Sequence, residues 1–329
     1  MPDKFRGSAT AADVAAAVLA GARAAGWTGT ALALADGGEG TLEALGGANR
    51  VTRVTDPLGR PVDAAWLLRP DGVAVVEAAR ASGLDLVGGA EGNDPVAATS
   101  RGTGELVVAA VDAGAREVVV TLGGSATTDG GSGALEVLAL RRPLGGPGAA
   151  VPVVVACDVT TRFLDAAAVF GPQKGAGTAQ VAVLTRRLAR QAQEYLDRWG
   201  VDVRDLPGGG AAGGLGGGLA ALGARLVPGF DLVARHAGLD AALADADLVV
   251  TGEGCLDGGS SQGKVVGGVV DRARRAGVPV LVVAGTVRAG HGLDAPVVPL
   301  AERFGQASWT RTAACVEQVI REYLERGHA

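Results

Sequence analysis

The chain has 329 residues and a net charge of −5, and its 48% hydrophobic and 20% charged residues are typical of globular proteins. Both signs of charge are spread along the chain and aromatic residues are only 3%, so we expect no nucleic-acid partner. Three widely spaced cysteines argue against a disulfide framework or a zinc site and fit a reducing cytoplasm, and no apolar run has the length of a membrane span.

The first part of the chain predicts a helix followed by short strands. An alanine-rich helix over residues 9–25 leads to a strand at 30–35 and then to the turn ADGGEGT at 35–41. The next apolar runs follow one another too closely for helices to fit between them, which predicts antiparallel neighbours; they cover residues 49–57, 60–68 and 72–79.

Further along the chain, helices and apolar strands alternate. A helix that starts near Thr103 feeds the strand VVVTL at 118–122, VPVVVACD at 151–158 is another buried strand, and a long polar helix covers 178–199. A strand, a helix and a second strand then form a βαβ unit, which implies parallel pairing; they cover residues 247–252, 264–277 and 278–285.

This order of elements predicts an α/β protein with two α/β domains. Because both chain ends have the same α/β texture, we expect them to form one doubly wound domain from residues 1–47 and 229–329. The middle, residues 48–228, is then a second, mixed α/β domain inserted into the first.

Glycine is unusually frequent, with 54 residues, more than twice the usual share of about 7%. It gathers in turns at strand ends and helix starts, and the turn GGSATTDGGSG at 123–133 is the richest of them. Successive backbone N–H groups in such a turn bind anions, Ser125 and Thr127 can donate to phosphate oxygens, and Asp129 can hold Mg²⁺. Taken alone, the turn is better explained by ordinary helix capping, with Asp129 as the cap.

The pattern recurs, which favours a shared ligand over simple capping. ADGGEGT at 35–41, SRGTGE at 100–105 and TGEGCLDGGSSQGK at 251–264 each place glycine with an acid or a hydroxyl group at a strand end or a helix start. In open α/β sheets, ligands bind at the carboxyl ends of the strands. The sequence therefore predicts a polyanionic ligand with a metal ion.

Two familiar phosphate motifs are incomplete. GGSSQGK at 258–264 has the spacing of a P-loop, but Val265 stands where a Mg²⁺-binding hydroxyl group is needed. Gly208, Gly210 and Gly213 match the dinucleotide fingerprint, yet a polar segment ending in Pro207 precedes them instead of a buried strand.

Phosphoryl transfer requires a carboxylate base, Mg²⁺ and cations. Asp158 ends a buried strand and is the best candidate for the base or a metal ligand, although a capping role explains it equally well. Glu39, Glu253 and Asp257 are further carboxylates in glycine turns, and Lys174 and Lys264 are the candidate cations. The three histidines lie outside every motif, so a histidine base is not expected.

Taken together, the motifs resemble the bacterial glycerate kinase I family in their order along nearly the whole chain. They include PDKFRGS, ADGGEGT, ASGL, GTGEL, GGSATTDGG, ACDVT, FGPQKGA, GGGAAGGLG and DLVVTGEG. The resemblance implies ATP-dependent phosphorylation of D-glycerate with Mg²⁺. It also implies that the domain made from both chain ends is flavodoxin-like and that the active site lies between the two domains.

The chain departs from the family pattern at several points. The family has an apolar strand before its PDSFKGS-like motif, whereas here Met1 directly precedes Pro2, so we expect the doubly wound sheet to lack that strand. Arg6 replaces the family's usual lysine, and Cys255 replaces a basic residue. The segment before VPVVVACD is also shorter than usual.

The resemblance and the motifs lead to one set of expected site residues. We expect catalytic roles for Asp158, Arg6, Lys174 and Lys264, and Mg²⁺ ligands at Asp36, Glu39 and Asp129. Substrate or nucleotide binding is expected at Asp3, Ser8, Gly37, Gly38, Gly102, Thr103, Gly123, Gly124, Ser125, Thr127, Gly252, Glu253 and Gly254.

The predicted function is therefore a cytoplasmic glycerate kinase that uses ATP and Mg²⁺ and yields 2- or 3-phosphoglycerate. Two alternatives stay open: another small hydroxy-acid or polyol kinase, and a nucleotide- or metabolite-binding protein whose turnover is impaired by the missing first strand. We expect glycerate and ATP as partners and no membrane, and an oligomer is compatible with the sequence.

Overall fold

The structure, a computed structural model, describes residues 1, 5, 7–139, 151–258 and 265–327. The chain forms two compact units. We call Met1–Asp36 with Val233–Ala329 the terminal unit and Gly37–Leu232 the inserted unit. The domain boundaries predicted from the sequence, 47/48 and 228/229, stay a prediction.

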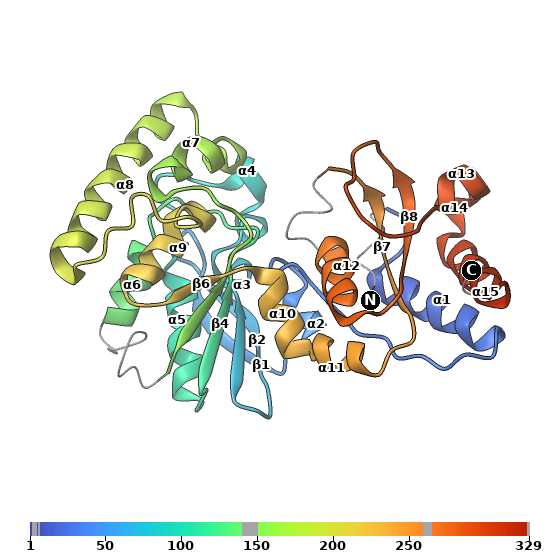
Figure 1. Cartoon of the computed structure of the whole chain (residues 1–329). Helices are drawn as coiled ribbons and strands as arrows, with labels where there is room; N and C mark the ends of the chain where they lie inside the picture. The colour runs from blue at the N-terminus through green and yellow to red at the C-terminus, as the bar shows by residue number, and fades with distance from the viewer. Residues whose placement is uncertain (2–4, 6, 140–150, 259–264, 328–329) are drawn as a thin grey trace. The chain divides into compact units, whose positions relative to one another are not determined.

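The inserted unit is built on a six-stranded sheet in the order β1-β2-β3-β4-β5-β6 (Figure 1). Its strands are β1 (Arg50–Thr55), β2 (Pro61–Leu68), β3 (Val73–Glu77), β4 (Glu117–Thr121), β5 (Val153–Ala156) and β6 (Arg225–Val227). β1, β2 and β3 pair antiparallel, as predicted, whereas β3 to β6 pair parallel. The carboxyl ends of β3 to β6 therefore share one edge of the sheet.

Helices of the inserted unit cover the sheet and bury its apolar side chains. Val118 and Val120 of β4 face the same core as Leu106 of α5 and Leu215 of α9. A second core joins Phe163 to the apolar stripe of α8, and Figure 1 shows α7, α8 and α9 gathered together. The helices are α2 (Thr41–Ala44), α3 (Ala79–Ser82), η1 (Asp85–Val87), α4 (Gly89–Gly92), α5 (Arg101–Asp112), α6 (Ser132–Leu138), η3 (Phe163–Asp165), α7 (Ala166–Phe170), η4 (Pro172–Lys174), α8 (Thr178–Trp199) and α9 (Ala211–Ala221).

The terminal unit has a parallel three-stranded sheet in the order β7-β8-β9, with β7 at Val249–Leu256, β8 at Val280–Val287 and β9 at Val297–Pro299. Leu281 and Val283 of β8 pack on α1 and α15, while Val282 and Ala284 point to the other face, where α12 packs. Helices on both faces make this unit doubly wound, and the predicted βαβ unit is confirmed. Its helices are α1 (Ala11–Ala24), α10 (Gly229–Ala237, which begins in the inserted unit), α11 (Leu239–Ala244), α12 (Val265–Ala276), α13 (Leu300–Phe304), α14 (Ala307–Thr310) and α15 (Thr312–Glu325).

Two predicted elements are wrong. Residues 30–35 are not a strand: much of the segment is exposed, and among the described residues its backbone pairs with no neighbouring strand. Gly252 and Gly254 do not lie in a turn, because β7 continues through them to Leu256. A Cβ at Gly252 would overlap the Val283 carbonyl group of β8, so glycine here permits close approach of two strands.

The glycine-rich start of α9 is also a packing feature. Ala212, Gly213 and Gly214 have left-handed backbone angles, with φ of 51°, 70° and 95°. Gly213 lies so close to the turn after β4 that a Cβ there would overlap the Thr127 carbonyl oxygen. This contact explains why glycine occupies the position without any dinucleotide ligand.

We expect Gly213→Ala to destabilise the protein by several kcal/mol more than Gly200→Ala. Both glycines have nearly equal φ angles, 70° and 71°, so both substitutions carry a left-handed strain of about 1 kcal/mol. Only the Cβ at position 213 meets backbone atoms, whereas position 200 has open space. Urea denaturation of both variants measures the difference, and equal losses would contradict the contact with Thr127.

Candidate active site

The candidate site of the inserted unit lies where β4 ends. The strand runs into the glycine turn and then into α6, so the predicted strand, turn and helix are confirmed. Gly123 is half-buried and Gly124 is exposed. The ADGGEGT turn packs against them: a Cβ at Gly123 would lie 3.3 Å from the backbone nitrogen of Glu39, and one at Gly124 would overlap the Glu39 carboxylate. Two predicted glycine turns therefore meet at this edge of the sheet.

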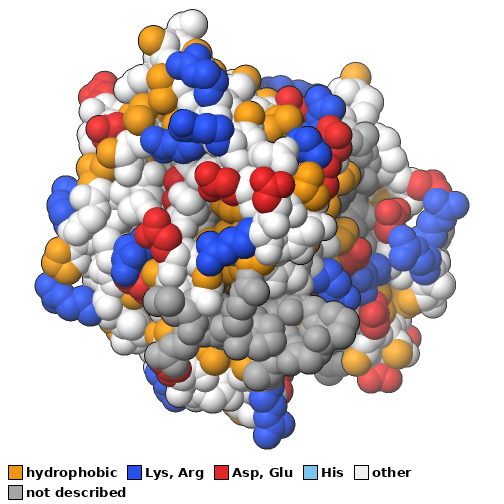
Figure 2. All heavy atoms as spheres, turned by 90° about the vertical axis from the view of Figure 1, so that its left-hand side faces the viewer, with side chains coloured by type: hydrophobic (Ala, Val, Ile, Leu, Met, Phe, Trp, Pro, Cys, Tyr) orange, Lys and Arg blue, Asp and Glu red, His pale blue; other side chains and the backbone are white. Residues whose placement is uncertain are grey.

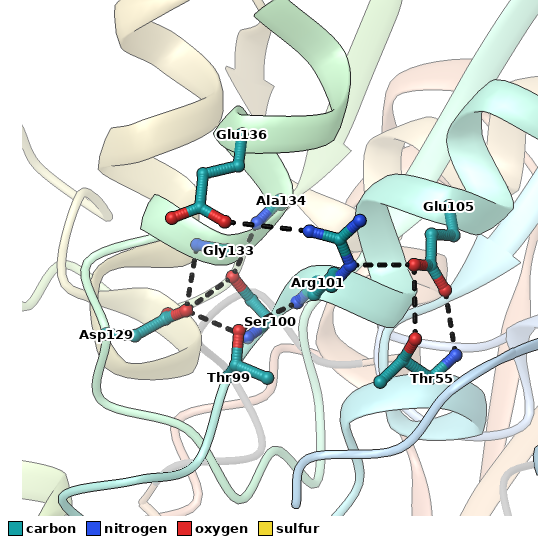
Figure 3. Close-up of polar contacts among 9 residues, drawn as sticks. All are labelled: Thr55, Thr99, Ser100, Arg101, Glu105, Asp129, Gly133, Ala134 and Glu136. Atoms are coloured by element: carbon teal, nitrogen blue, oxygen red, sulfur yellow. Dashed lines mark hydrogen bonds and ion pairs between the residues drawn. The ribbon is translucent and has the colours of Figure 1, made fainter. Parts of the chain in front are cut away.

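Asp129 holds the starts of two helices (Figure 3). Its side chain is only 4% exposed, and its Oδ2 accepts hydrogen bonds from the Ser100 N–H, the Ser100 hydroxyl group and the Gly133 N–H at 2.8, 2.9 and 3.1 Å. Its Oδ1 accepts the Gly131 N–H at 3.0 Å. Because four donors already share this carboxylate, its geometry fits the capping role better than the predicted Mg²⁺ role.

The SRGTGE segment is tied to the same turn through α5. Figure 3 shows Arg101 between the carboxylates of Glu105 and Glu136, and Glu105 accepts the Thr55 N–H at 2.8 Å. The predicted ligand contacts in this segment face the interior instead. A Cβ at Gly102 would overlap the Thr55 carbonyl group, and the buried Thr103 hydroxyl group lies 2.7 Å from the Ser82 hydroxyl group.

Lys174 lies inside the protein, beneath the glycine turn. It is 2% exposed, and its Nζ donates to the Ser125 Oγ at 2.9 Å and to the Thr127 carbonyl oxygen at 2.6 Å. Burial lowers the pKa of Lys174 to about 7, and the nearby charge of Asp129 opposes that shift. Lys174 therefore acts on the turn, while its burial keeps it from solvent.

This arrangement fixes the direction in which Ser125 can donate. When Lys174 is protonated, its amine has no lone pair, so the Ser125 oxygen accepts from Lys174 and the Ser125 proton points elsewhere. Among the described residues nothing accepts that proton, although Ser125 is only 6% exposed. A buried hydroxyl group with an unsatisfied donor, next to Gly123 and Gly124, is suited to an anionic ligand.

Asp158 lies at the carboxyl end of β5, the strand next to β4. It is exposed, and its Oδ1 accepts the Gly229 N–H at 2.8 Å at the first residue of α10. Gly37 packs directly on Gly229, since a Cβ at Gly37 would lie 2.5 Å from the Gly229 Cα. Asp158 thus satisfies the start of a helix and still reaches solvent, and its role as base or metal ligand stays a prediction.

Several residues that shape the site were missed from the sequence. Asn93 donates to the carbonyl groups of Ala126 and Lys174, and Gln191 and Tyr195 of α8 donate to those of Asp129 and Gly130. Glu77 ends β3 and binds the ADGGEGT turn. The signal for Glu77 was present, since an acid that ends an apolar strand is the pattern that singled out Asp158. Gln191 could have been noticed as a polar residue within the apolar stripe of a long helix.

The remaining predicted residues are in the terminal unit or outside the described residues. Ser8 lines a groove of about 630 Å³ between α1 and α15, and Glu253 lies in β7 with Gly252 and Gly254. Asp3, Arg6 and Lys264 lie outside the described residues. The predicted roles of these residues stay predictions.

Within the described part of the chain, no group of three or more His, Cys, Asp or Glu side chains is arranged to hold a metal ion. Mg²⁺ commonly binds through one or two carboxylates and completes its shell with phosphates and water. Glu39, exposed beside Gly124, fits that pattern better than Asp129 does, and Asp36 lies three residues before it in the sequence.

The surface charge and the described helices relate to two expectations from the sequence, that the protein has no nucleic-acid partner and no membrane span. Over the described residues of the face in Figure 2, positive, negative and apolar side chains are interspersed. None of the described helices has the length and apolar character needed to cross a membrane.

Comparison with known proteins places these features in a family. The model of the glycerate kinase family matches residues 1–145 and 144–298. The chain belongs to the glycerate kinase family. The resemblance seen in the motifs is thereby confirmed.

Individual members of the glycerate kinase family align over most of their length. Glycerate 2-kinase of Escherichia coli K12 is 38% identical over 335 positions, which cover 89% of this chain and 88% of that protein. Glycerate kinase of Bacillus subtilis 168 is 38% identical and aligns with 99% of this chain and 94% of its own. A crystal structure assigned to glycerate kinase 2 of Salmonella typhimurium LT2 is 37% identical, with a TM-score of 0.83 over 99% of this chain and 96% of that one. The mixed α/β architecture with its two sheets is therefore that of a glycerate kinase structure.

We expect the stability of this family member to depend on pH through Lys174. Its pKa is about 7 in the folded protein and 10.5 in the unfolded chain, so between these values the unfolded state binds the extra proton. Raising the pH from 7 towards 10 should therefore stabilise the wild type relative to Lys174→Met, by up to about 1.4 kcal/mol per pH unit. Urea denaturation across this range measures the difference, and a difference independent of pH would show that Lys174 stays charged when buried.

Proposed function

We propose that this protein is an ATP-dependent kinase that phosphorylates D-glycerate with the help of Mg²⁺. Its family membership supports a glycerate kinase. The observation that carries the proposal further is the Ser125 hydroxyl group, which accepts from Lys174 at 2.9 Å and whose own proton, when Lys174 is protonated, lacks an acceptor among the described residues. Beside two accessible glycines, it is suited to donate to a phosphate or carboxylate oxygen.

The residues divide into four roles. Ser125 and the backbone of Gly123 and Gly124 bind the anionic ligand. Asp158 accepts the proton of the attacking glycerate hydroxyl group, since it is exposed at the edge of the sheet where ligands of α/β proteins bind. Mg²⁺, when bound, neutralises phosphate charge, and Glu39 is the residue we expect to hold it. Lys174 stays buried and positions Ser125.

The cytoplasm is the proposed location, in agreement with three free cysteines. The name of the Escherichia coli relative favours 2-phosphoglycerate over 3-phosphoglycerate as the product. The alternatives are a kinase for another hydroxy acid or a polyol, and a metabolite-binding protein without turnover.

We expect ADP release from ATP that depends on D-glycerate, with Ser125→Ala raising the KM of one anionic substrate by roughly tenfold or more. Removing a hydrogen bond to a charged group costs about 1.5–3 kcal/mol, which corresponds to that change. A coupled assay measures both constants, a substrate panel includes uncharged polyols, and ³¹P NMR identifies the product. Ser132→Ala, a serine in the same turn without a proposed role, is the control. Turnover of polyols alone, or no turnover, would refute the proposal.

We expect Asp158→Asn to lower kcat by roughly 10²–10⁴-fold while leaving the fold as stable as the wild type. Asparagine keeps an oxygen for the Gly229 N–H but cannot accept a proton at neutral pH. Asp158→Ala should lose the same activity and, in addition, about 1 kcal/mol of stability. Steady-state kinetics and thermal unfolding separate these effects. Asp158 is not the base if the asparagine variant keeps a kcat within twofold of the wild type.

A further inference from the structure

Glu77 is a buried carboxylate that the function described so far does not use. It is the last residue of β3 and is 2% exposed. Its Oε1 accepts hydrogen bonds from the backbone N–H groups of Gly40 at 3.0 Å and Leu42 at 3.1 Å. These two amides lie at the start of α2, directly after Glu39 in the ADGGEGT turn. One oxygen of Glu77 therefore joins the end of a central strand to this turn.

The other oxygen of Glu77 is held by a cation. Its Oε2 accepts from the Arg80 Nε at 3.1 Å, and Arg80 also reaches Glu43 of α2 at 3.0 Å. Partial burial lowers the pKa of Arg80, but the hydrogen bond and charge of Glu77, followed by those of Glu43, outweigh this effect and raise it. Because removing a carboxylate from water is costly, a buried acid with every oxygen satisfied indicates a position that the fold holds closely.

The turn that Glu77 holds has little stiffness of its own. Gly37 and Gly40 have left-handed backbone angles, with φ of 85° and 90°, and no side chain caps α2 at Gly40. Within the turn, the Thr41 hydroxyl group donates to the Gly38 carbonyl oxygen at 2.8 Å. Its outer side presents Glu39 to Gly123 and Gly124. The position of Glu39 at the end of β4 thus depends on the contact between Glu77 and the Gly40 and Leu42 amides.

We propose that Glu77 is a positioning residue for phosphoryl transfer, which fixes the ADGGEGT turn and thereby Glu39 against the anion-binding turn after β4. This inference rests on the proposed function, since it assumes that the two turns share one ligand. Glu77 is buried and contacts no substrate. Its effect passes through the two amides and Glu39.

The chain offers a matched control for a purely structural role. Asp56 is 4% exposed; its Oδ1 accepts the N–H groups of Leu58 and Arg60, each at 2.8 Å, and its Oδ2 accepts the Arg60 Nε at 2.6 Å. The hydrogen bonds are the same in kind as those of Glu77, but they hold the hairpin between β1 and β2. Asp56→Asn therefore removes an equivalent buried charge without touching the ADGGEGT turn.

The experiment compares Glu77→Gln with Asp56→Asn in the full-length protein. The Gln side chain must turn its NH₂ group towards either the two backbone N–H groups or Arg80, which places donors against donors. Hydrogen exchange followed by mass spectrometry on peptides covering residues 37–45 should be faster in Glu77→Gln and unchanged in Asp56→Asn. The kcat for glycerate should fall by roughly tenfold or more in Glu77→Gln only, because small displacements of reacting groups are costly. Circular dichroism and thermal unfolding verify that both variants fold.

A double-variant test traces the path of the effect. If Glu77 acts through Glu39, adding Glu77→Gln to Glu39→Ala should lower kcat by less than the product of the two single effects. Unchanged exchange in residues 37–45, a kcat within twofold of the wild type, equal losses in Asp56→Asn, or independent effects with Glu39→Ala would each overturn the inference. If the wild type does not phosphorylate glycerate, the proposed function fails, and the exchange comparison alone decides whether Glu77 holds the turn.

Discussion

A turn made of glycine has few side chains to pack, so the turn after β4 depends on two buried ionisable side chains that hold it. Asp129 accepts the N–H groups at the starts of α5 and α6, and Lys174 donates to Ser125 and Thr127. Each charge would be costly inside the protein without these partners, and their mutual attraction moderates the cost. The glycines give the backbone freedom to approach a ligand, and the buried pair then restricts that freedom to one conformation.

A buried carboxylate also holds the second glycine turn at this edge of the sheet. Glu77 accepts backbone N–H groups at the start of α2, as Asp129 does at the starts of α5 and α6. In both cases a carboxylate inside the protein orients the turn, while the accessible atoms, those of Glu39, Gly123 and Gly124, are presented outside. Catalysis by fixed donors and charges requires such rigidity, because groups that must reorient during reaction lose much of their effect.

Periodicity predicted the elements whose pattern is long or locally complete. Helix α8 was placed over its exact range, and the β1–β3 meander and the β7–β8 unit were confirmed. The prediction of a strand at 30–35 was wrong because an apolar run cannot show whether a partner strand lies beside it. The predicted turn at Gly252 was wrong for a different reason. Glycine permits both tight turns and close contacts between strands, and only the position of Val283 distinguishes the two. Motifs pointed to the candidate site, but burial was needed to tell which acids face inward.

Burial also distinguishes acids that the sequence motifs could not tell apart. Asp129 and Asp158 both follow neighbouring parallel strands, yet Asp129 shares its carboxylate among four donors inside the protein, whereas Asp158 is exposed and accepts the N–H group at the start of α10. A base must exchange its proton with the reacting hydroxyl group and with solvent, so of these two acids Asp158 is the one we propose for that role. The same argument applies to the predicted cations. Since Lys174 is buried and contacts Ser125, the proposed function leaves the charge of a polyanion to glycine N–H groups, to Mg²⁺, or to Arg6 and Lys264, which lie outside the described residues.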